Sequence, residues 1–279
     1  MDTESKPLPE IVFKYFVYAE HANPNKDPSS PEGMPRLSSY HCGLISQGCM
    51  SHSIRMQLRR QGKDIFCLSG KDAGDGMNSL EERARKRYGR LEYTDIIKRL
   101  CSDYEDVRLF GTPPFPYKDI NGNKINVSVA ATITFGFGES INTITLDPPE
   151  NIVKETKEGK KFFVNHYVES ALYEVTGGIN LWQAQKVGLT TEDIEDYKNC
   201  LPHLFDKNRN CQKGGVLQVS DIFWWQMDPG EEHSFMLFDS VSGSIKEGVS
   251  RPQKYDDYII TIDESNIAPE HIHLSLIAR

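Results

Sequence analysis

The chain has 279 residues, of which 38% are hydrophobic and 26% are charged, which suits one compact core with insertions. Its net charge of -8 excludes a polycationic nucleic-acid coat of the histone type. The sequence contains no apolar run near the roughly 18 residues of a spanning helix and starts without a signal-peptide pattern, so it predicts a cytoplasmic protein.

Basic residues are concentrated in one segment. Residues 51–99 hold 12 lysines and arginines against 7 acidic residues, whereas residues 111–279 hold 15 against 24. If a polyanion binds, we expect it to contact residues 51–99 first, because phosphate backbones are held by lysine and arginine. The alternative is an ordinary basic helix surface.

The first element is a predicted strand at residues 10–20, which is apolar on both faces and therefore central in a sheet. A long loop with four prolines follows, and loops of this length are uncommon unless they are functional. A helix is predicted at about 44–61, where Met50, Ile54 and Leu58 recur every four residues. On the neighbouring face Ser51, Arg55 and Arg59 form a polar stripe.

Capping-box spacing between Ser79 and Glu82 predicts a basic helix that ends at Gly89, and a short helix should start at Thr94. Residues 104–111 read as a strand closed by glycine. The pair Asn121-Gly122 is the strongest hairpin signal in the chain, and a protruding β-hairpin is predicted around it.

In the second half, residues 162–176 are ambiguous between strand and helix. Asn180 and Thr190 are expected to cap two short helices, which end at 188 and at about 205. Three short strands follow in FMLFDSV, YIITI and HIHLSL. The whole pattern is α+β and mostly antiparallel.

No catalytic or cofactor motif is present: GxSxG, HExxH, GxGxxG and GxxxxGKS are all missing. The six cysteines show no CxxC pair and no zinc spacing, which favours reduced, mostly buried thiols. His271 and His273 share one strand face, but without a third ligand we assign no metal. No cofactor is predicted.

The residues do offer phosphate-binding chemistry, which needs arginines, hydroxyls, amides and glycine turns rather than base readout. Candidates occur on the helix, in the proline-rich loop and in the turn after residue 205, and they are Ser51, His52, Arg55, Arg59, Asn23, Asn25, Lys207, Arg209 and Lys213.

Several blocks resemble, in collinear order, the backbone subunit of type I CRISPR effector complexes (Cascade), most closely subtype I-C. They are NPNKDP (23–28), GMPRL (33–37), CMSHSIR (49–55), DVRLFG (106–111), ALYEVTGG (171–178), AQKVGLTTEDIE (184–195) and LFDKNRNCQKGG (204–215). The resemblance covers nearly the whole chain. The sequence differs from the family where Ser51, His52 and Ser53 replace a Lys-Arg-Lys cluster, and where INVSVAAT replaces a Gly-Pro-Val-Gln strand.

The resemblance implies a modified RRM-like, ferredoxin-type antiparallel core, forming one palm domain over residues 1–279. A helical web is implied at about 62–103 and a β-hairpin thumb at about 111–135. Such subunits polymerise head to tail along one CRISPR RNA (crRNA), each covering six nucleotides. The thumb flips every sixth base, and the bases between pair with target single-stranded DNA. Further implied partners are the 5′-end cap, large and small subunits of Cascade, with no membrane.

A non-catalytic RNA-holding subunit is therefore the expected function, in which Arg36, Arg60 and Arg108 join the phosphate contacts. Phe115 is the candidate thumb wedge, and the alternative for it is an aromatic side chain tucked into the loop. The alternative is an RNA endonuclease of the same RRM-like class that uses Asp27 with a metal ion, although an Asp that fixes a proline-rich turn is the simpler explanation of this residue. A domain that binds no nucleic acid is a third possibility.

Overall fold

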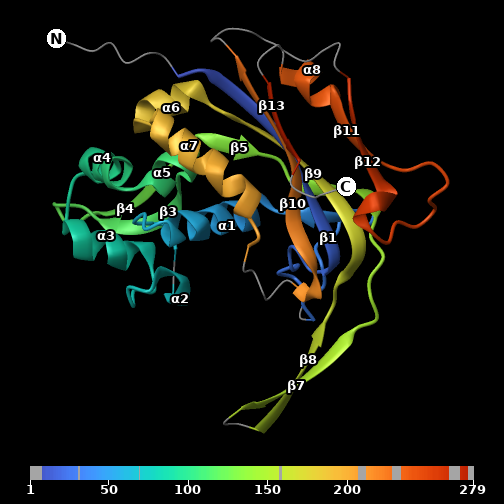
Figure 1. Ribbon diagram of the computed structural model, residues 1–279. Helices are drawn as coiled ribbons and strands as arrows, with labels where there is room; N and C mark the ends of the chain where they lie inside the picture. Colours follow the sequence, from blue (N-terminus) through green and yellow to red (C-terminus); the bar gives the residue numbers. More distant parts are fainter. Residues whose placement is uncertain are drawn as a thin grey trace.

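Strand β1 (Glu10–Ala22) lies at the centre of an antiparallel seven-stranded sheet in the computed structural model (Figure 1). Its neighbours are β10 (Gln212–Met227) and β9 (Val168–Ile179). The full order is β13 (His271–Ser275), β10, β1, β9, β6 (Gly138–Thr143) and β2 (Cys42–Ile45), and β5 (Ile133–Phe135) also pairs with β9. The structure describes residues 8–30, 32–68, 70–156, 159–206, 212–227, 234–263 and 271–275.

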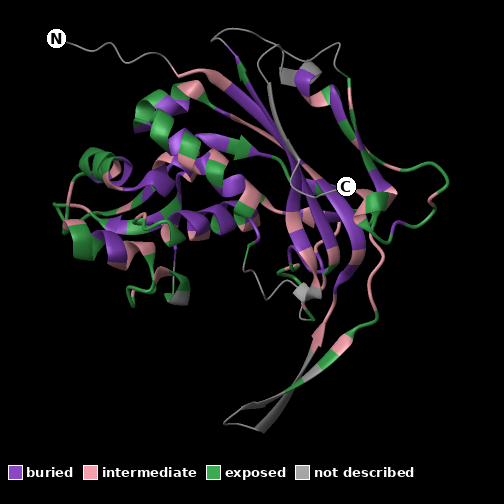
Figure 2. Ribbon diagram, viewed as in Figure 1, coloured by how far each residue is buried: buried purple, intermediate pink, exposed green. Residues whose placement is uncertain are grey.

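Both faces of β1 are buried, as the sequence predicts. Phe13 and Tyr15 point into a large cluster under helices α1 (Gln47–Arg60), α6 (Leu181–Val187) and α7 (Thr191–Cys200). Val12 and Phe16 point the other way, into a second cluster under α8 (Ser234–Asp239) and the hairpin β11 (Val241–Ile245)–β12 (Tyr258–Ile262). Alternating side chains therefore fill two cores, one on each face of the sheet. Figure 2 shows the central strands coloured as buried.

A helical lobe, defined as residues 63–130, adjoins α1 on the side away from the sheet (Figure 1). It contains α2 (Gly70–Ala73), α3 (Leu80–Tyr88), α4 (Tyr93–Asp103), α5 (Glu105–Phe110) and the hairpin β3 (Thr112–Lys118)–β4 (Lys124–Val129). The helices predicted from capping signals at Ser79, Asn180 and Thr190 are confirmed.

The predicted strand at 104–111 is wrong, because these residues form helix α5. Tyr104 is extended and begins the helix, and Gly111, with φ of 62°, ends it. The short apolar run does not distinguish a buried strand from a buried helix. Here the helix is selected by tertiary contacts, since the Asp106 carboxylate accepts hydrogen bonds from the backbone of Phe66 and Cys67.

The hairpin turn at Asn121-Gly122 is confirmed, but the hairpin does not protrude. Phe115 is only 4% exposed and its ring lies 5.7 Å from that of Phe66. The expectation of a projecting tip with Phe115 as its wedge is therefore wrong, because one face of β3–β4 packs into the lobe. The hairpin that extends from the body is β7 (Glu150–Thr156)–β8 (Gly159–Asn165) (Figure 1).

FMLFDSV was expected to be a strand, but most of it forms helix α8 before β11 begins. The Lys14 ammonium donates hydrogen bonds to the carbonyls of Phe238 and Val241, at 2.7 and 2.5 Å, and pairs with Glu174 at 2.9 Å. A cation at a helix C-terminus satisfies carbonyls that have no partner within the helix. A contact from a distant strand thus stabilises this end of α8.

Two short 3-10 helices, η1 (Leu201–His203) and η3 (Tyr255–Asp257), complete the described elements. Among the described residues, no helix combines the length and the apolar character that a bilayer crossing requires.

Candidate nucleic-acid interface

Helix α1 begins beside the proline-rich loop, where Asn25 holds the start of the helix and Asn23 ties the loop to the segment before β9. The Asn25 carbonyl oxygen accepts from both the backbone and the hydroxyl of Ser46, at 2.9 and 2.7 Å, and Ser46 in turn caps α1. The Asn23 amide donates to the carbonyls of Gly33 and His166, each at 3.0 Å. Both asparagines are buried, so they shape the loop from within rather than present amides to solvent.

Arg55 lies inside the protein, where each of its three guanidinium nitrogens donates a hydrogen bond. It donates to the Asp106 carboxylate at 3.0 Å, to the Ser51 hydroxyl at 3.4 Å and to the Gly111 carbonyl at 3.3 Å. It also stacks over Phe110 at 5.2 Å. This placement corrects the interpretation of Ser51 and Arg55 as a solvent-facing stripe, because α5 covers that side of α1.

Arg108 is also committed internally. It forms a bidentate pair with Asp193, at 2.8 and 2.6 Å, and donates to the Cys101 carbonyl at 2.9 Å. Asp193 at the same time caps the first turn of α7 through Thr190. Arg108 therefore joins the helical lobe to α7, and its geometry is that of a structural contact rather than of an exposed phosphate ligand.

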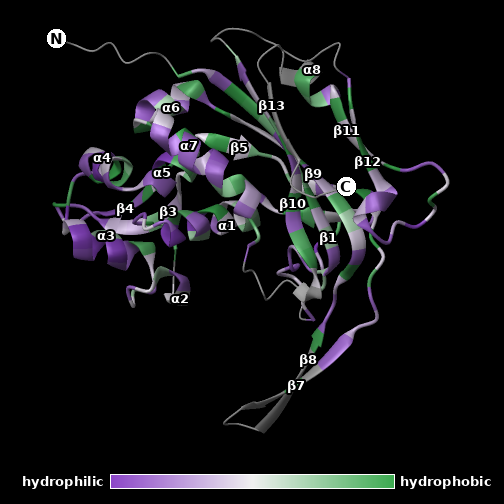
Figure 3. Cartoon of the chain, viewed as in Figure 1, coloured by the Kyte–Doolittle hydropathy of each residue, from purple (hydrophilic) through white to green (hydrophobic). Residues whose placement is uncertain are grey.

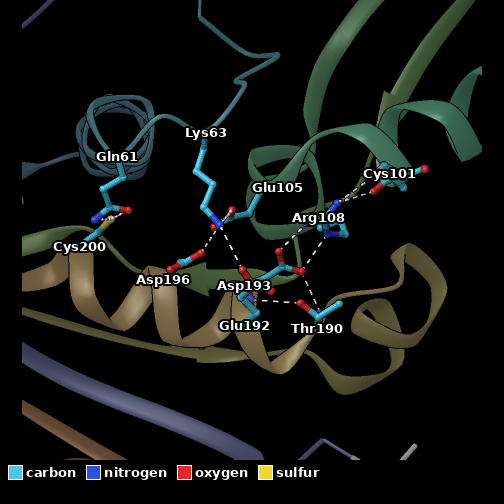
Figure 4. Close-up of polar contacts among 11 residues, drawn as sticks. Gln61, Lys63, Cys101, Glu105, Arg108, Thr190, Glu192, Asp193, Asp196 and Cys200 are labelled. Carbon is cyan, nitrogen blue, oxygen red and sulfur yellow. Dashed lines mark hydrogen bonds and ion pairs between the residues drawn. The ribbon is translucent and has the colours of Figure 1, made fainter.

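A second ion group stands beside this pair (Figure 4). Lys63 contacts Glu105 at 3.0 Å and also pairs with Asp196. The hydrogen bond to Asp196 raises the pKa of Lys63, and burial raises the pKa of Glu105. Together with Arg108–Asp193, this group fixes α7 against the C-terminal end of α1 and against α5.

Four of the predicted cationic or imidazole side chains do reach the surface. His52 and Arg60 are exposed, and Arg59 and Arg36 are partly exposed. Arg60 donates to the Asp206 carbonyl at 3.0 Å, and Arg36 stacks at 5.5 Å over Phe137, whose side chain is 55% exposed. Lys26, also exposed, was missed by the sequence analysis although it lies inside the NPNKDP block.

We define the α1 surface as Lys26, His52, Arg59 and Arg60. Lys207 and Arg209 lie outside the described residues, and Lys213 is described only as part of strand β10. Residues 206 and 212 bound that segment: Asp206 contacts Arg60, and Gln212 pairs with Ala22 at the end of β1.

Asp27 fixes a turn. Its carboxylate accepts from the Ser29 backbone at 2.9 Å and from the Ser29 hydroxyl at 2.7 Å, and these bonds lower the pKa of Asp27. This geometry fits the turn role that the sequence offered as the simpler explanation. Across the described part of the chain, no three His, Cys, Asp or Glu side chains gather into a set that could hold a metal ion.

Comparison with known proteins gives one family. The family model described as "CRISPR-associated protein Cas7" matches residues 10–263. A chain from a "CRISPR RNA-guided surveillance complex, pre-nicking" is 13% identical with a TM-score of 0.43, over 77% of each chain. A chain from a "CRISPR RNA-guided surveillance complex" is 11% identical with a TM-score of 0.43, over 81% of this chain and 73% of that one. No curated protein sequence gives a significant match.

Proposed function

The chain belongs to the CRISPR-associated Cas7 family, and from this premise we propose that it is a backbone subunit that binds crRNA within a cytoplasmic Cascade complex of subtype I-C. In this proposal, copies assemble head to tail along the guide, each around an RRM-like palm, and present bases for pairing with target DNA. The family match across residues 10–263 is the observation that carries the proposal.

The α1 surface supplies a physical basis for guide binding. Lys26, Arg59 and Arg60 bring positive charge to the start and end of α1, and the exposed imidazole of His52 lies between them on the helix. Among the residues that the structure describes, none of these side chains pairs with a buried carboxylate, in contrast to Arg55 and Arg108, and His52 contacts only the exposed Asp72, at 3.6 Å. Cations of this kind bind phosphates without reading sequence, and base edges remain free for pairing.

Copurification with a discrete guide is the expected result when the chain is produced together with a crRNA. The ultraviolet absorbance spectrum of the eluted particle should be that of a nucleic-acid complex. A denaturing gel should show a single short RNA, and the mass of the particle should correspond to several chains per guide. A protein-only absorbance spectrum, obtained from folded chain in the presence of the guide, would contradict the proposed function.

The same preparation tests the non-catalytic part of the proposal. Labelled RNA complementary to the guide, incubated with Mg²⁺, should remain intact, because Asp27 is engaged in its turn with Ser29. Cleavage that disappears in an Asp27→Asn variant would instead establish the endonuclease alternative.

The projecting hairpin β7–β8 is the part we assign as the thumb. Its strands pair from Glu150–Asn165 to Thr156–Gly159, and Val153 on it is 51% exposed. An exposed apolar side chain on an arm is suited to unstacking bases, as in proteins that insert apolar wedges between base steps. The lobe hairpin β3–β4, packed through Phe115, is suited to holding the lobe together.

Replacing residues 151–164 with a short Gly-Ser turn is expected to leave a folded chain that no longer assembles regularly on the guide. The body should survive, because the base of the arm is anchored separately by the bridge between Leu146 and Val168. Circular dichroism checks the fold, and nuclease footprinting checks whether the periodic protection of the guide is lost. A footprint identical to that of the unmodified chain would rule out the thumb assignment.

A further inference from the structure

A small cavity of about 90 Å³ lies between α3 and β3 in the helical lobe, lined by Glu81, Arg85, Arg90, Tyr117 and Lys118. Three of these five residues are exposed cations. Within the described part of the chain, no carboxylate forms an ion pair with any of the three, and Glu81 is the single acidic residue in the lining. The cavity therefore carries net positive charge.

The position of Arg90 is set by a buried phenol. Tyr117 is 1% exposed, and its hydroxyl donates to the Gly89 carbonyl at 2.9 Å and accepts from the Leu91 backbone at 3.0 Å. Gly89 ends α3 with φ of 71°, a conformation that L side chains rarely adopt. The turn is thus held against β3 from both sides of Arg90, which brings this guanidinium to the cavity.

Other arginines of α3 are treated differently. Arg83 pairs with Asp75 at 2.7 Å, and Arg87 pairs with Asp64 at 2.6 Å. Arg85 lies between these two along α3, and no described carboxylate forms an ion pair with it. Carboxylates from outside α3 therefore pair with two of its guanidinium groups, and a third guanidinium group lies at the cavity.

The hairpin adds an unfavourable arrangement at the same place. Lys118 and Lys124 are direct cross-strand partners and both are exposed. Like charges directly opposite each other destabilise a strand pair. Placed beside Arg85 and Arg90, this pair adds positive charge that a bound anion would neutralise.

From these observations we propose that the cavity binds a phosphate of a nucleic-acid backbone, at a place outside the α1 surface. Its volume is about that of three water molecules, which suits one phosphate group. Two guanidinium groups and one ammonium provide charge-assisted donors for phosphate oxygens. Further exposed cations on α3, α4 and β4, which are Lys86, Lys98, Arg99 and Lys124, favour a polyanion over a free ion. Figure 3 shows α3 as strongly hydrophilic.

This inference rests on the proposed function, and the phosphate can come either from the guide or from a DNA strand. The test uses the full chain, purified free of RNA, carrying Arg85→Ser, Arg90→Ser and Lys118→Ser. A matched control carries Lys246→Ser, Arg251→Ser and Lys254→Ser, which removes the same charge from the β11–β12 connection. The probes are guide RNA, a short DNA duplex without complementarity to the guide, and inorganic phosphate as competitor.

We expect the cavity variant to bind guide RNA or duplex about fivefold or more weakly, with a shallower dependence of log K on log salt, while the control stays within about twofold. Because the substitutions relieve repulsion, the thermal midpoint should not fall. A loss confined to RNA identifies the guide as the ligand, and a loss confined to the duplex identifies DNA.

Unchanged affinity for both nucleic acids would overturn the inference, as would an equal loss in the control. Binding of inorganic phosphate that the substitutions abolish, with nucleic-acid binding unchanged by them, would also overturn it, since the site would then take a free ion. If the unmodified chain binds no guide RNA, the proposed function fails, and the duplex probe still reports on the cavity.

Discussion

Replacing Asp106 with alanine is expected to lower the free energy of unfolding by about 3–5 kcal/mol, because it removes one partner of a buried ion pair. Asp106 is 0% exposed. Its carboxylate accepts from Arg55 at 3.0 Å and from the backbone N–H groups of Phe66 and Cys67 at 2.9 and 3.0 Å. The substitution leaves a guanidinium and two backbone donors buried without their acceptor.

Denaturant unfolding of the isolated chain measures this loss. Asp72→Ala is the matched control, because this exposed carboxylate contacts only His52 at 3.6 Å in the described structure, and surface pairs contribute little. The double variant Arg55→Met, Asp106→Leu should recover part of the lost stability, since it removes both charges together. A loss below about 1 kcal/mol for Asp106→Ala would show that this carboxylate does not hold α1 to α5.

The second large effect is expected in guide binding. Arg59→Ser combined with Arg60→Ser should weaken the affinity of the chain for guide RNA by roughly tenfold to hundredfold, the range for losing two charge-assisted phosphate contacts. The slope of log K against log salt should become shallower by about 1 to 1.5, because each phosphate on a single strand contributes about 0.7. Filter binding over a salt series measures both quantities.

The Arg55→Ala variant tests whether Arg55 contributes to guide binding or to the stability of the fold. The sequence alone predicts that Arg55 binds phosphate, so that Arg55→Ala combined with Arg59→Ala would weaken guide binding directly. The structure indicates instead that Arg55 acts on stability through Asp106. The Arg55→Ala variant should have a lower melting temperature than the unmodified chain. The melting temperature of the Arg59→Ser, Arg60→Ser variant should be unchanged. Lys246→Ser with Lys254→Ser controls for general charge. An unchanged salt slope in the Arg59, Arg60 variant would remove the α1 surface from guide binding.

Local signals in the sequence were sufficient for most elements. The apolar alternation of residues 10–20 predicts a strand buried on both faces, and the caps at Ser79, Asn180 and Thr190 predict three helices, all of which the structure confirms. These patterns work because side-chain period and capping depend on neighbours within a few residues.

The candidate site was less predictable, because its decisive contacts are distant in the chain. Arg55 and Asp106 are separated by 51 residues, and Arg108 and Asp193 by 85. A polar stripe on a helix has the same pattern whether it faces solvent or a buried carboxylate. Likewise, the alternation in β3 marks two faces, but it does not say that the face with Phe115 packs into the lobe.

The antiparallel pairing of β1 also has a consequence for synthesis on the ribosome. β1 is made well before its partner β10, which begins at Gln212, and the register joins Glu10 to Met227. At about 5–20 residues per second, roughly 200 further residues take about 10 to 40 seconds to translate. During that interval a strand that is apolar on both faces has no completed sheet around it. The nascent chain therefore needs protection from aggregation until β10 has emerged.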